Sequence, residues 1–407
     1  MSLRILLTLI LFFPVCCFAQ YNISGKVYNA VDNSPFPDAS VFLSNTTIGA
    51  RSNADGSFFI NDVKPGKYTL VVSAVGFESH TEEIMLDRNF SLRDVKLLPK
   101  STVLQDVTIK FDAAREKRLK LFTQELLGWS ENAKETKILN PEVVSLKIDK
   151  DSVLTASADD YIQIENKALG YNIKYLLKVF SLQLKTGLVS YTGEYKFEKM
   201  QGTSSEDHRW EKHRKEAYLG SPKHFFRSLI ANTYKKDGFT VYKVVREHKP
   251  LFVDTNFVKS LIVNDSLIRV KDDTNSYRVV VKKDTVKYNK KNPPMEKLRI
   301  IDPQLTAKEI FSPTDQPGIY ALRFDDLLKN IMFVIYTKKL TMNSAYEFVN
   351  RRRFLIDRPT TFVAFTKPYA LFDSNGIITS AGSIAYSGDW SVTRVADLLP
   401  VDYWPNE

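Results

Sequence analysis

The sequence predicts a mainly β protein in two parts, an antiparallel β-sandwich followed by a helix and a strand-rich α+β part. Short β-prone runs recur through residues 21–97, separated by turn residues at roughly 8–12 positions, as in a sandwich. Residues 113–130 then change to a helical period. Most of the remaining chain is again β-prone, and an aromatic fraction of 12% is typical of globular rather than disordered chains.

Turn residues bound the expected strands of the first part. Asn53-Ala54-Asp55-Gly56 predicts a tight hairpin turn, because glycine tolerates the positive φ that such turns demand, and Pro65-Gly66 predicts a second turn. The strands expected between these turns are 23–28, 39–43, 57–60, 68–72, 82–86 and 94–97.

The order SGKVYNAVDNSPFPDASVFL, followed by NADGSFFINDVKPGKYTLVVSAVGFES, resembles the carboxypeptidase regulatory-like domain. The resemblance covers about residues 21–99 and implies an antiparallel β-sandwich of prealbumin-like topology. In envelope proteins this domain commonly precedes the plug and barrel of TonB-dependent receptors, and residues 102–109 look like the linker found there. The roughly 300 residues that follow are too few for a plug and a barrel of some twenty strands, so we do not expect a receptor.

Residues 1–19 are typical of a secretory signal peptide. Arg4 precedes an apolar run from Ile5 to Phe13, which is shorter than the roughly 20 residues that span a bilayer. Both cysteines, Cys16 and Cys17, lie in this segment, so its cleavage would leave no thiol for a disulfide, a zinc site or a nucleophile. We therefore expect an exported protein of the periplasm or outer membrane, or one exposed at the cell surface.

Four segments are expected along the chain. They are the signal peptide at 1–19, the sandwich at 20–99, a linker strand and amphipathic helix at 100–135, and an uncharacterised, strand-rich α+β domain at 136–407. The net charge of +10 falls in the later part, because residues 20–100 are close to neutral. This excess could favour an anionic membrane surface, although an ordinary solvated surface explains it better. Nucleic acid is not an expected partner of an exported protein.

Three helices are expected in the second part. Leu119, Phe122, Leu126 and Trp129 share one face of the first, within 113–130. The other two are expected at 206–218 and 222–234, and the last should bury a stripe of Phe226, Leu229, Ile230 and Thr233. The strands expected there are 143–148, 161–165, 173–177, 181–185, 241–245, 261–263, 277–282, 320–324, 333–336, 361–365 and 383–386, with an exposed basic loop at 282–299.

Three phrases in this part look like a family of uncharacterised envelope proteins that carry the same N-terminal module. They lie at 161–171 (YIQIENKALGY), 209–218 (RWEKHRKEAY) and 394–400 (RVADLLP). The resemblance spans most of 110–407 and brings no established activity with it.

The histidines suggest zinc chemistry only weakly. His80 and Glu83 have the His-x-x-Glu spacing of zinc carboxypeptidases, and His208 lies downstream as a third candidate ligand. His80 is expected on a sandwich strand, however, whereas these enzymes place their ligands in a separate α/β domain. His208 and His213 are five residues apart, not the four that put two ligands on one helical face. No metal site or cofactor is therefore expected.

Other catalytic signatures are weak or missing from the sequence. It contains no G-x-S-x-G, Walker loop or G-x-G-x-x-G. The acid pairs Asp159-Asp160 and Asp325-Asp326 could serve glycoside hydrolysis, but adjacent acids point in different directions. Aromatic residues could stack on sugars but more often fill a core; they are Phe225, Phe226, Tyr369, Phe372 and Trp390. Arg351-Arg352-Arg353 is expected at an exposed strand end.

Three hypotheses for function remain. The first is a non-catalytic module that binds a protein partner, expected to be another envelope protein, with the sandwich as its docking unit. The second is a glycan-binding protein. The third is a hydrolase with an unrecognised site in 136–407. No catalytic, cofactor-binding or metal-binding residue is predicted.

Overall fold

The computed structural model describes residues 20–100, 113–246, 298–301, 304–323, 330–339, 345–349, 352–356, 358–380 and 382–405. The chain divides into two compact units, an N-terminal unit of Met1–Leu43 with Ile48–Ser101, and a second unit of Ser44–Thr47 with Thr102–Glu407. Several predictions lie outside the described residues: the signal peptide at 1–19, the linker strand at 102–109, the strands at 261–263 and 277–282, most of the basic loop at 282–299, and Asp325-Asp326.

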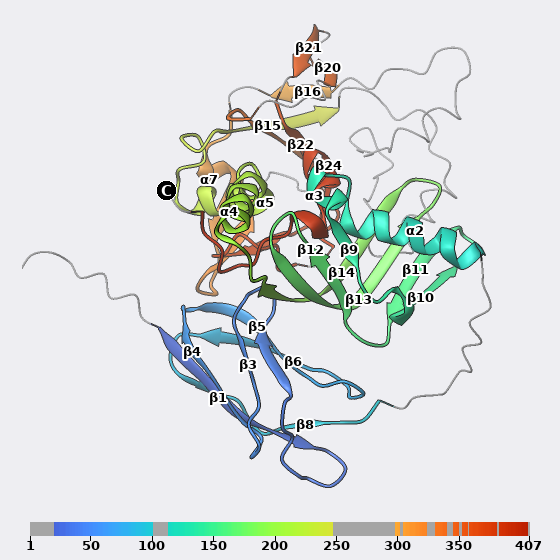
Figure 1. The fold of residues 1–407 in the computed structure, drawn as a ribbon. Coiled ribbons are helices and arrows are strands. Elements are labelled where there is room, and N and C mark those ends of the chain that lie inside the picture. The colour runs from blue at the N-terminus through green and yellow to red at the C-terminus, as the bar shows by residue number, and fades with distance from the viewer. Residues whose placement is uncertain are drawn as a thin grey trace, which may run out of the picture. The chain divides into compact units, whose positions relative to one another are not determined.

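The N-terminal unit is the predicted β-sandwich, drawn in blue in Figure 1. One sheet has the order β4 (Ser57–Val63), β1 (Tyr21–Asn29) and β7 (Phe90–Ser91), with β8 (Val95–Leu97) also paired to β1. The other has the order β3 (Gly49–Arg51), β2 (Ser40–Leu43), β5 (Gly66–Ser73) and β6 (His80–Leu86). Most pairs are antiparallel, while β1 pairs in parallel with β7 and β8. The predicted fold class is confirmed.

Alternation along the strands explains which side chains form the sandwich core. In β4, Phe58 and Ile60 point inward and are buried, whereas Phe59 between them is 60% exposed. The predicted turn at Asn53–Gly56 is present, and Gly56 has φ +77°. A Cβ atom on Gly56 would lie 2.4 Å from the carbonyl oxygen of Val27, so this turn requires glycine.

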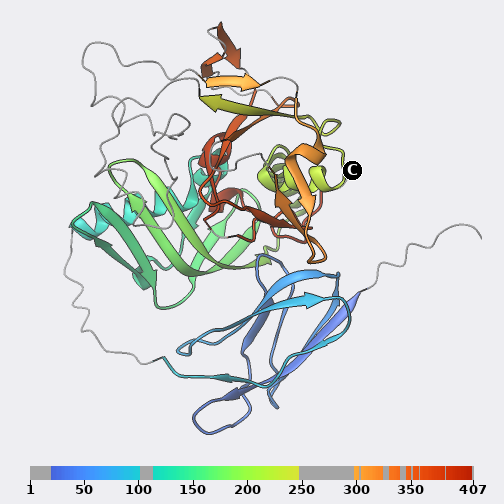
Figure 2. The same ribbon diagram turned by 180° about the vertical axis from the view of Figure 1, so that it is seen from behind.

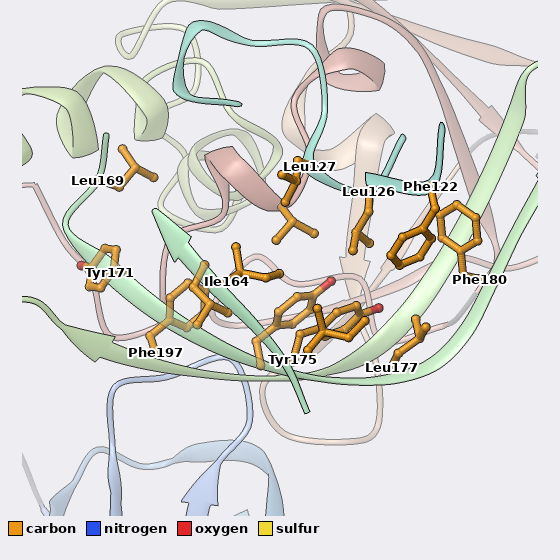
Figure 3. Packing of buried hydrophobic residues seen from close by; sticks show 14 of the residues in the cluster. Phe122, Leu126, Leu127, Ile164, Leu169, Tyr171, Tyr175, Leu177, Phe180 and Phe197 are labelled. Atoms are coloured by element: carbon orange, nitrogen blue, oxygen red, sulfur yellow. The ribbon is translucent and has the colours of Figure 1, made fainter. Parts of the chain in front are cut away.

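The second unit begins with a curved sheet and a helix that covers its concave face. The sheet has the order β10 (Val144–Ile148), β11 (Val153–Ala158), β13 (Tyr171–Gln183), β12 (Ile162–Asn166) and β9 (Thr136–Ile138), with β14 (Leu188–Lys199) also paired to β13. Phe122 and Leu126 of α2 (Ala113–Leu127) are fully buried against it. Figure 3 shows Phe122 beside Phe180, and their ring centroids are 4.7 Å apart.

Two strand predictions in this sheet were wrong. The run 173–177 and the first three residues of 181–185 belong to one long strand, β13, whose register is irregular between Leu177 and Val179. Its partner β14, which contains Gly193, was not predicted. The ring of Tyr175 occupies the space beside this glycine, where a Cβ atom would lie 2.2 Å from the ring.

The helix predictions held except at their ends. α2 ends at Leu127 and is followed by Gly128 with φ +101°, so Trp129 leaves the helical face and is 55% exposed. α4 (Ser204–Tyr218) is close to its prediction, while α5 (Pro222–Ile230) ends before 234. Of the predicted stripe on α5, Phe226 and Leu229 are buried, whereas Ile230 is only partly buried and Thr233 lies beyond the end of the helix. The buried side chains are instead six in a row: His224, Phe225, Phe226, Arg227, Ser228 and Leu229.

The rest of the second unit is a larger sheet with a small one beside it, seen from behind in Figure 2. The larger sheet has the order β21 (Arg352–Ile356), β20 (Ala345–Val349), β16 (Leu298–Ile301), β15 (Phe239–Arg246), β19 (Ile331–Tyr336), β22 (Thr360–Phe365) and β24 (Ile384–Gly388). The small sheet has the order β17 (Phe311–Pro313), β18 (Ile319–Leu322) and β23 (Leu371–Asp373). Both contribute side chains to a core around α5.

Short helices connect these elements. They are α3 (Glu131–Lys134), α7 (Ala307–Ile310), α8 (Asp389–Val392) and 3₁₀ turns at Pro141–Val143 and Val395–Asp397. Among the described residues, no helix has the length and apolar character needed to span a bilayer.

Candidate functional site

The structure brings the three sequence phrases together around α4. Side chains of the second phrase engage backbone carbonyls of the first. Trp210 Nε1 donates to Lys167 O at 2.8 Å, and Arg214 Nε donates to Leu169 O at 2.7 Å. The Arg214 guanidinium also lies 4.3 Å from the ring centroid of Tyr171. Since these groups hold the backbone of the loop before β13, their role here is structural.

The third phrase joins the same junction through a buried amide. The Asn166 side chain is fully buried, donates through Nδ2 to Ala396 O at 2.9 Å, and accepts from Leu169 N at 3.0 Å. Tyr403, just beyond the phrase, donates through its hydroxyl to Glu211 Oε1 at 3.0 Å. The three phrases therefore form one packed junction. This structural role accounts for them without any catalytic role.

A second cluster forms where α5 meets the C-terminal segment. Arg227 is 5% exposed and donates to three carbonyl oxygens: Asn375 O at 2.9 Å, Tyr403 O at 3.0 Å and Val401 O at 2.6 Å. One turn earlier, Lys223 Nζ donates to Leu399 O and, at 3.1 Å, to Pro400 O. Two cations on one face of α5 thus hold the carbonyls of residues 399–403.

Burial shifts the pKa values of the ionisable groups in this cluster. It lowers the pKa of Lys223 to about 7, and the nearby Arg227 charge adds to the effect. Burial raises the pKa of Asp373, although the amides of Ile377 and Asn375 donate to its carboxylate and oppose the shift. Perturbed pKa values occur at active sites and in structural networks alike. The carbonyl contacts of Lys223 and Arg227 favour a structural network.

His224 lies deeper, among the aromatic rings of the α5 core. Its Nδ1 accepts from Gly220 N at 3.1 Å, and its ring centroid lies 4.9 Å from that of Phe239. Burial lowers the pKa of His224 to about 4, with the charges of Lys338 and Arg227 acting in the same direction and Asp237 opposing them. The imidazole is therefore neutral in the folded protein near pH 7.

The lowered pKa of His224 predicts that the second unit loses stability in acid. The unfolded chain protonates His224 below pH 6.5, whereas the folded chain resists protonation until about pH 4. Its contribution to stability is therefore complete above pH 6.5 and declines as the pH falls toward 4, by about 3 kcal/mol in all. Denaturant unfolding followed by tryptophan fluorescence should show a smaller loss between pH 6.5 and 4.5 in His224→Gln than in the wild type. Equal losses would contradict the assignment.

Trp404 presents an indole ring on top of the buried Arg227. The guanidinium carbon lies 3.9 Å from the centroid of the ring, yet Trp404 as a whole is 53% exposed. One face of the ring is therefore covered by a fixed cation while much of the residue remains in water.

The N-terminal unit carries three exposed aliphatic side chains at one end. Val31 is 72% exposed, Val75 is 80% exposed and Leu98 is 53% exposed. We call these three residues the apolar end. Single exposed apolar residues scattered over a surface are common. Exposed apolar residues that lie next to one another are unusual, and they mark interaction surfaces.

Backbone hydrogen bonds bring the three segments of the apolar end together. Ala30 N donates to Leu97 O at 2.9 Å, which continues the β1–β8 pairing and sets Val31 near Leu98. Lys100 N donates to Gly76 O at 2.8 Å, which sets the loop of Val75 beside the same segment.

The candidate zinc ligands do not converge in the described structure. His80 Nε2 lies 3.4 Å from Glu82 Oε2, while Glu83 forms an ion pair with Lys67 at 2.8 Å. His208 Nδ1 lies 2.6 Å from Ser204 O in its own helix, and His213 Nδ1 lies 3.0 Å from Ala168 O. Within the described ranges, no cluster of three histidine, cysteine, aspartate or glutamate side chains could hold a metal.

The aromatic candidates are mostly core residues. Phe225, Phe226 and Phe372 are fully buried and Trp390 is 5% exposed, which leaves Tyr369, at 50%, as the exposed member of the set. Of the acid pair at 159–160, Asp160 accepts from the adjacent Tyr161 N at 2.7 Å. The sequence did not single out Trp404, whose exposure depends on the fold around α5.

A hollow of about 190 Å³ lies along the edge formed by β9 and β12. Its lining residues are Lys134, Glu135, Thr136, Lys137, Glu165 and Lys167. Lys137 and Lys167 both pair with Glu165 Oε2, at 3.1 and 3.7 Å. These charges satisfy one another at the surface, and the hollow is not the deep pocket of converging acids and histidines that the hydrolase hypothesis requires.

Comparison with known proteins identifies the N-terminal unit. Residues 23–109 match the family model of the CarboxypepD_reg-like domain, so the chain contains this domain, as the sequence resemblance implied. A search of curated proteins finds no match to the chain.

Similar solved structures include a cohesin–X-dockerin complex and a pilus backbone protein. One is a type II cohesin–X-dockerin complex from Acetivibrio cellulolyticus, with 18% identity over 19% of this chain and 56% of that chain and a TM-score of 0.18. The other is the pilus 2b backbone protein of group B streptococcus, with 15% identity over 20% of this chain and 42% of that chain and a TM-score of 0.17. The matches span about half the length of those chains, and at these TM-scores they carry no functional argument.

Proposed function

We propose that this protein is an exported, non-catalytic binding module that docks a protein partner of the cell envelope through its N-terminal CarboxypepD_reg-like domain. Residues 1–19 support export to the periplasm or outer membrane, because their charge and apolar run are typical of a signal peptide. The observation that carries the docking proposal is the apolar end, Val31, Val75 and Leu98.

The exposure of these side chains favours a protein partner. Exposing apolar surface to water costs about 25 cal/mol of free energy per Å². Binding of a partner would remove the surface of these side chains from water. The three side chains come from three separate segments, so the surface depends on the folded sandwich rather than on a peptide motif. They offer no charge for an anionic membrane and no polar group that would orient a sugar.

Loss of the apolar end should therefore abolish capture of the partner. The test is crosslinking in intact cells that naturally produce the protein, followed by purification and mass spectrometry. The variant carries Val31→Ser, Val75→Ser and Leu98→Ser. The control carries Phe59→Ser and Met85→Ser, which also remove exposed apolar side chains (60% and 42% exposed) from the same domain.

We expect one dominant envelope partner with the wild type and the control, and its loss with the triple variant. Because the replaced side chains are exposed, each change should alter stability by no more than about 0.5 kcal/mol, and circular dichroism checks that the domain is folded. No partner above background with the wild type, or equal capture by the wild type and the folded triple variant, would overturn the proposal.

A further inference from the structure

We infer that Trp404 is a stacking platform for a neutral sugar ring, at a site separate from the apolar end. The geometry points to this ligand because one face of the indole ring is held by a buried cation, while the residue remains 53% exposed. A pyranose presents a flat face of C–H groups and a rim of hydroxyls, and the first of these matches an open indole face.

The support beneath the ring is rigid. Arg227 cannot swing away, because its guanidinium donates to three carbonyl oxygens at 2.6–3.0 Å and is 5% exposed. Tyr403, next in the chain to Trp404, is 8% exposed and donates to Glu211. The indole is thus pre-organised, and a ligand would lose little free energy by ordering it.

The surroundings of the ring are polar. Arg227 connects Trp404 to the turn at Ser374-Asn375, since its Nε donates to Asn375 O. Ser374 is exposed and Asn375 is half-buried, so polar residues form the turn whose carbonyl oxygen Arg227 holds. An isolated aromatic ring with polar neighbours suits a sugar, whereas a protein hot spot is surrounded by further contacts that exclude water.

The cation also predicts selectivity among sugars. The Arg227 guanidinium interacts with the π electrons on the covered face of the indole. A second cation on the open face would be repelled by the positive charge of Arg227. The site should therefore favour neutral sugars over ammonium-bearing ones. Hexasaccharides of N-acetylglucosamine and of unacetylated glucosamine differ in this charge and provide a matched pair of probes.

The test is a titration of the purified protein that is monitored by calorimetry. The four probes are the hexasaccharides of the N-acetylglucosamine, glucosamine, maltose and cellulose series. We expect at least one neutral hexasaccharide to bind with a Kd below about 1 mM, and Trp404→Ala to weaken it about tenfold. Trp404→Tyr should retain most of the affinity. Trp129→Ala is the matched control, because Trp129 is 55% exposed, and it should bind as the wild type does.

Three results would each overturn the inference. The first is no binding by any neutral hexasaccharide. The second is equal affinity in Trp404→Ala and Trp129→Ala, and the third is tighter binding of the glucosamine hexasaccharide than of its acetylated counterpart. The triple variant of the apolar end should bind the sugar normally, so failure of the protein-partner proposal and failure of this one give different results. If Trp404→Ala lost a protein partner and no sugar bound, the platform would belong to a protein interface instead.

Discussion

Replacing Arg227 with methionine is expected to lower the free energy of unfolding of the second unit by about 3 kcal/mol or more, since each buried acceptor left without a donor costs roughly 1–3 kcal/mol. Methionine keeps much of the side-chain volume but donates no hydrogen bond. Three carbonyl oxygens, of Asn375, Val401 and Tyr403, would lose the donor that now satisfies them. Buried acceptors without a partner are costly, and hydrogen bonds from a charged donor are among the stronger ones.

Tryptophan fluorescence reports this effect selectively. All four tryptophans, at 129, 210, 390 and 404, lie in the second unit, so urea unfolding followed by fluorescence isolates it. The control is Arg209→Met, because Arg209 is 44% exposed and its ion pair with Glu135 at 3.3 Å should contribute less than about 1 kcal/mol. Similar losses in the two variants would show that Arg227 does not hold the C-terminal segment.

Replacing Gly170 with alanine is expected to destabilise the second unit by about 3 kcal/mol or more. Gly170 has φ +66°, which an L side chain adopts only with strain. Its Cβ would also lie 2.3 Å from Cδ2 of Trp210. That ring cannot retreat easily, because it is 4% exposed and its Nε1 donates to Lys167 O.

Gly187 supplies the matched control. It has nearly the same backbone conformation, with φ +73°, but no atom lies within 4 Å of the position of its Cβ. Gly187→Ala should therefore cost only the backbone strain, about 1–2 kcal/mol. The difference between the two variants in urea unfolding measures the clash with Trp210. Equal losses would mean that the loop and α4 are not packed as described.

The sandwich could be predicted from the sequence because its turns are local chemistry. The residue types at Asn53–Gly56 determine the turn whatever else the chain does. The long strand β13 was harder, because the exposed pair Lys178 and Val179 breaks its alternation and makes one strand look like two. Trp129 was misplaced because Gly128 ends the helix before the apolar spacing does.

The candidate sites depend on contacts between residues far apart in the chain. Arg227 meets acceptors 148 to 176 positions away, and no local pattern identifies a charge that will be buried against carbonyls. Val31, Val75 and Leu98 are ordinary aliphatic residues in the sequence. They become a surface only when β1, β8 and the loop at residue 75 come together at one end of the sandwich.

A photo-crosslinking amino acid at Val75 tests the central claim most directly. The control position is Asn61, an exposed residue of β4 at the opposite end of β1. Irradiation of intact cells should attach one envelope protein at position 75 and not at position 61. Attachment at both positions, or only at 61, would show that the apolar end is not the docking surface.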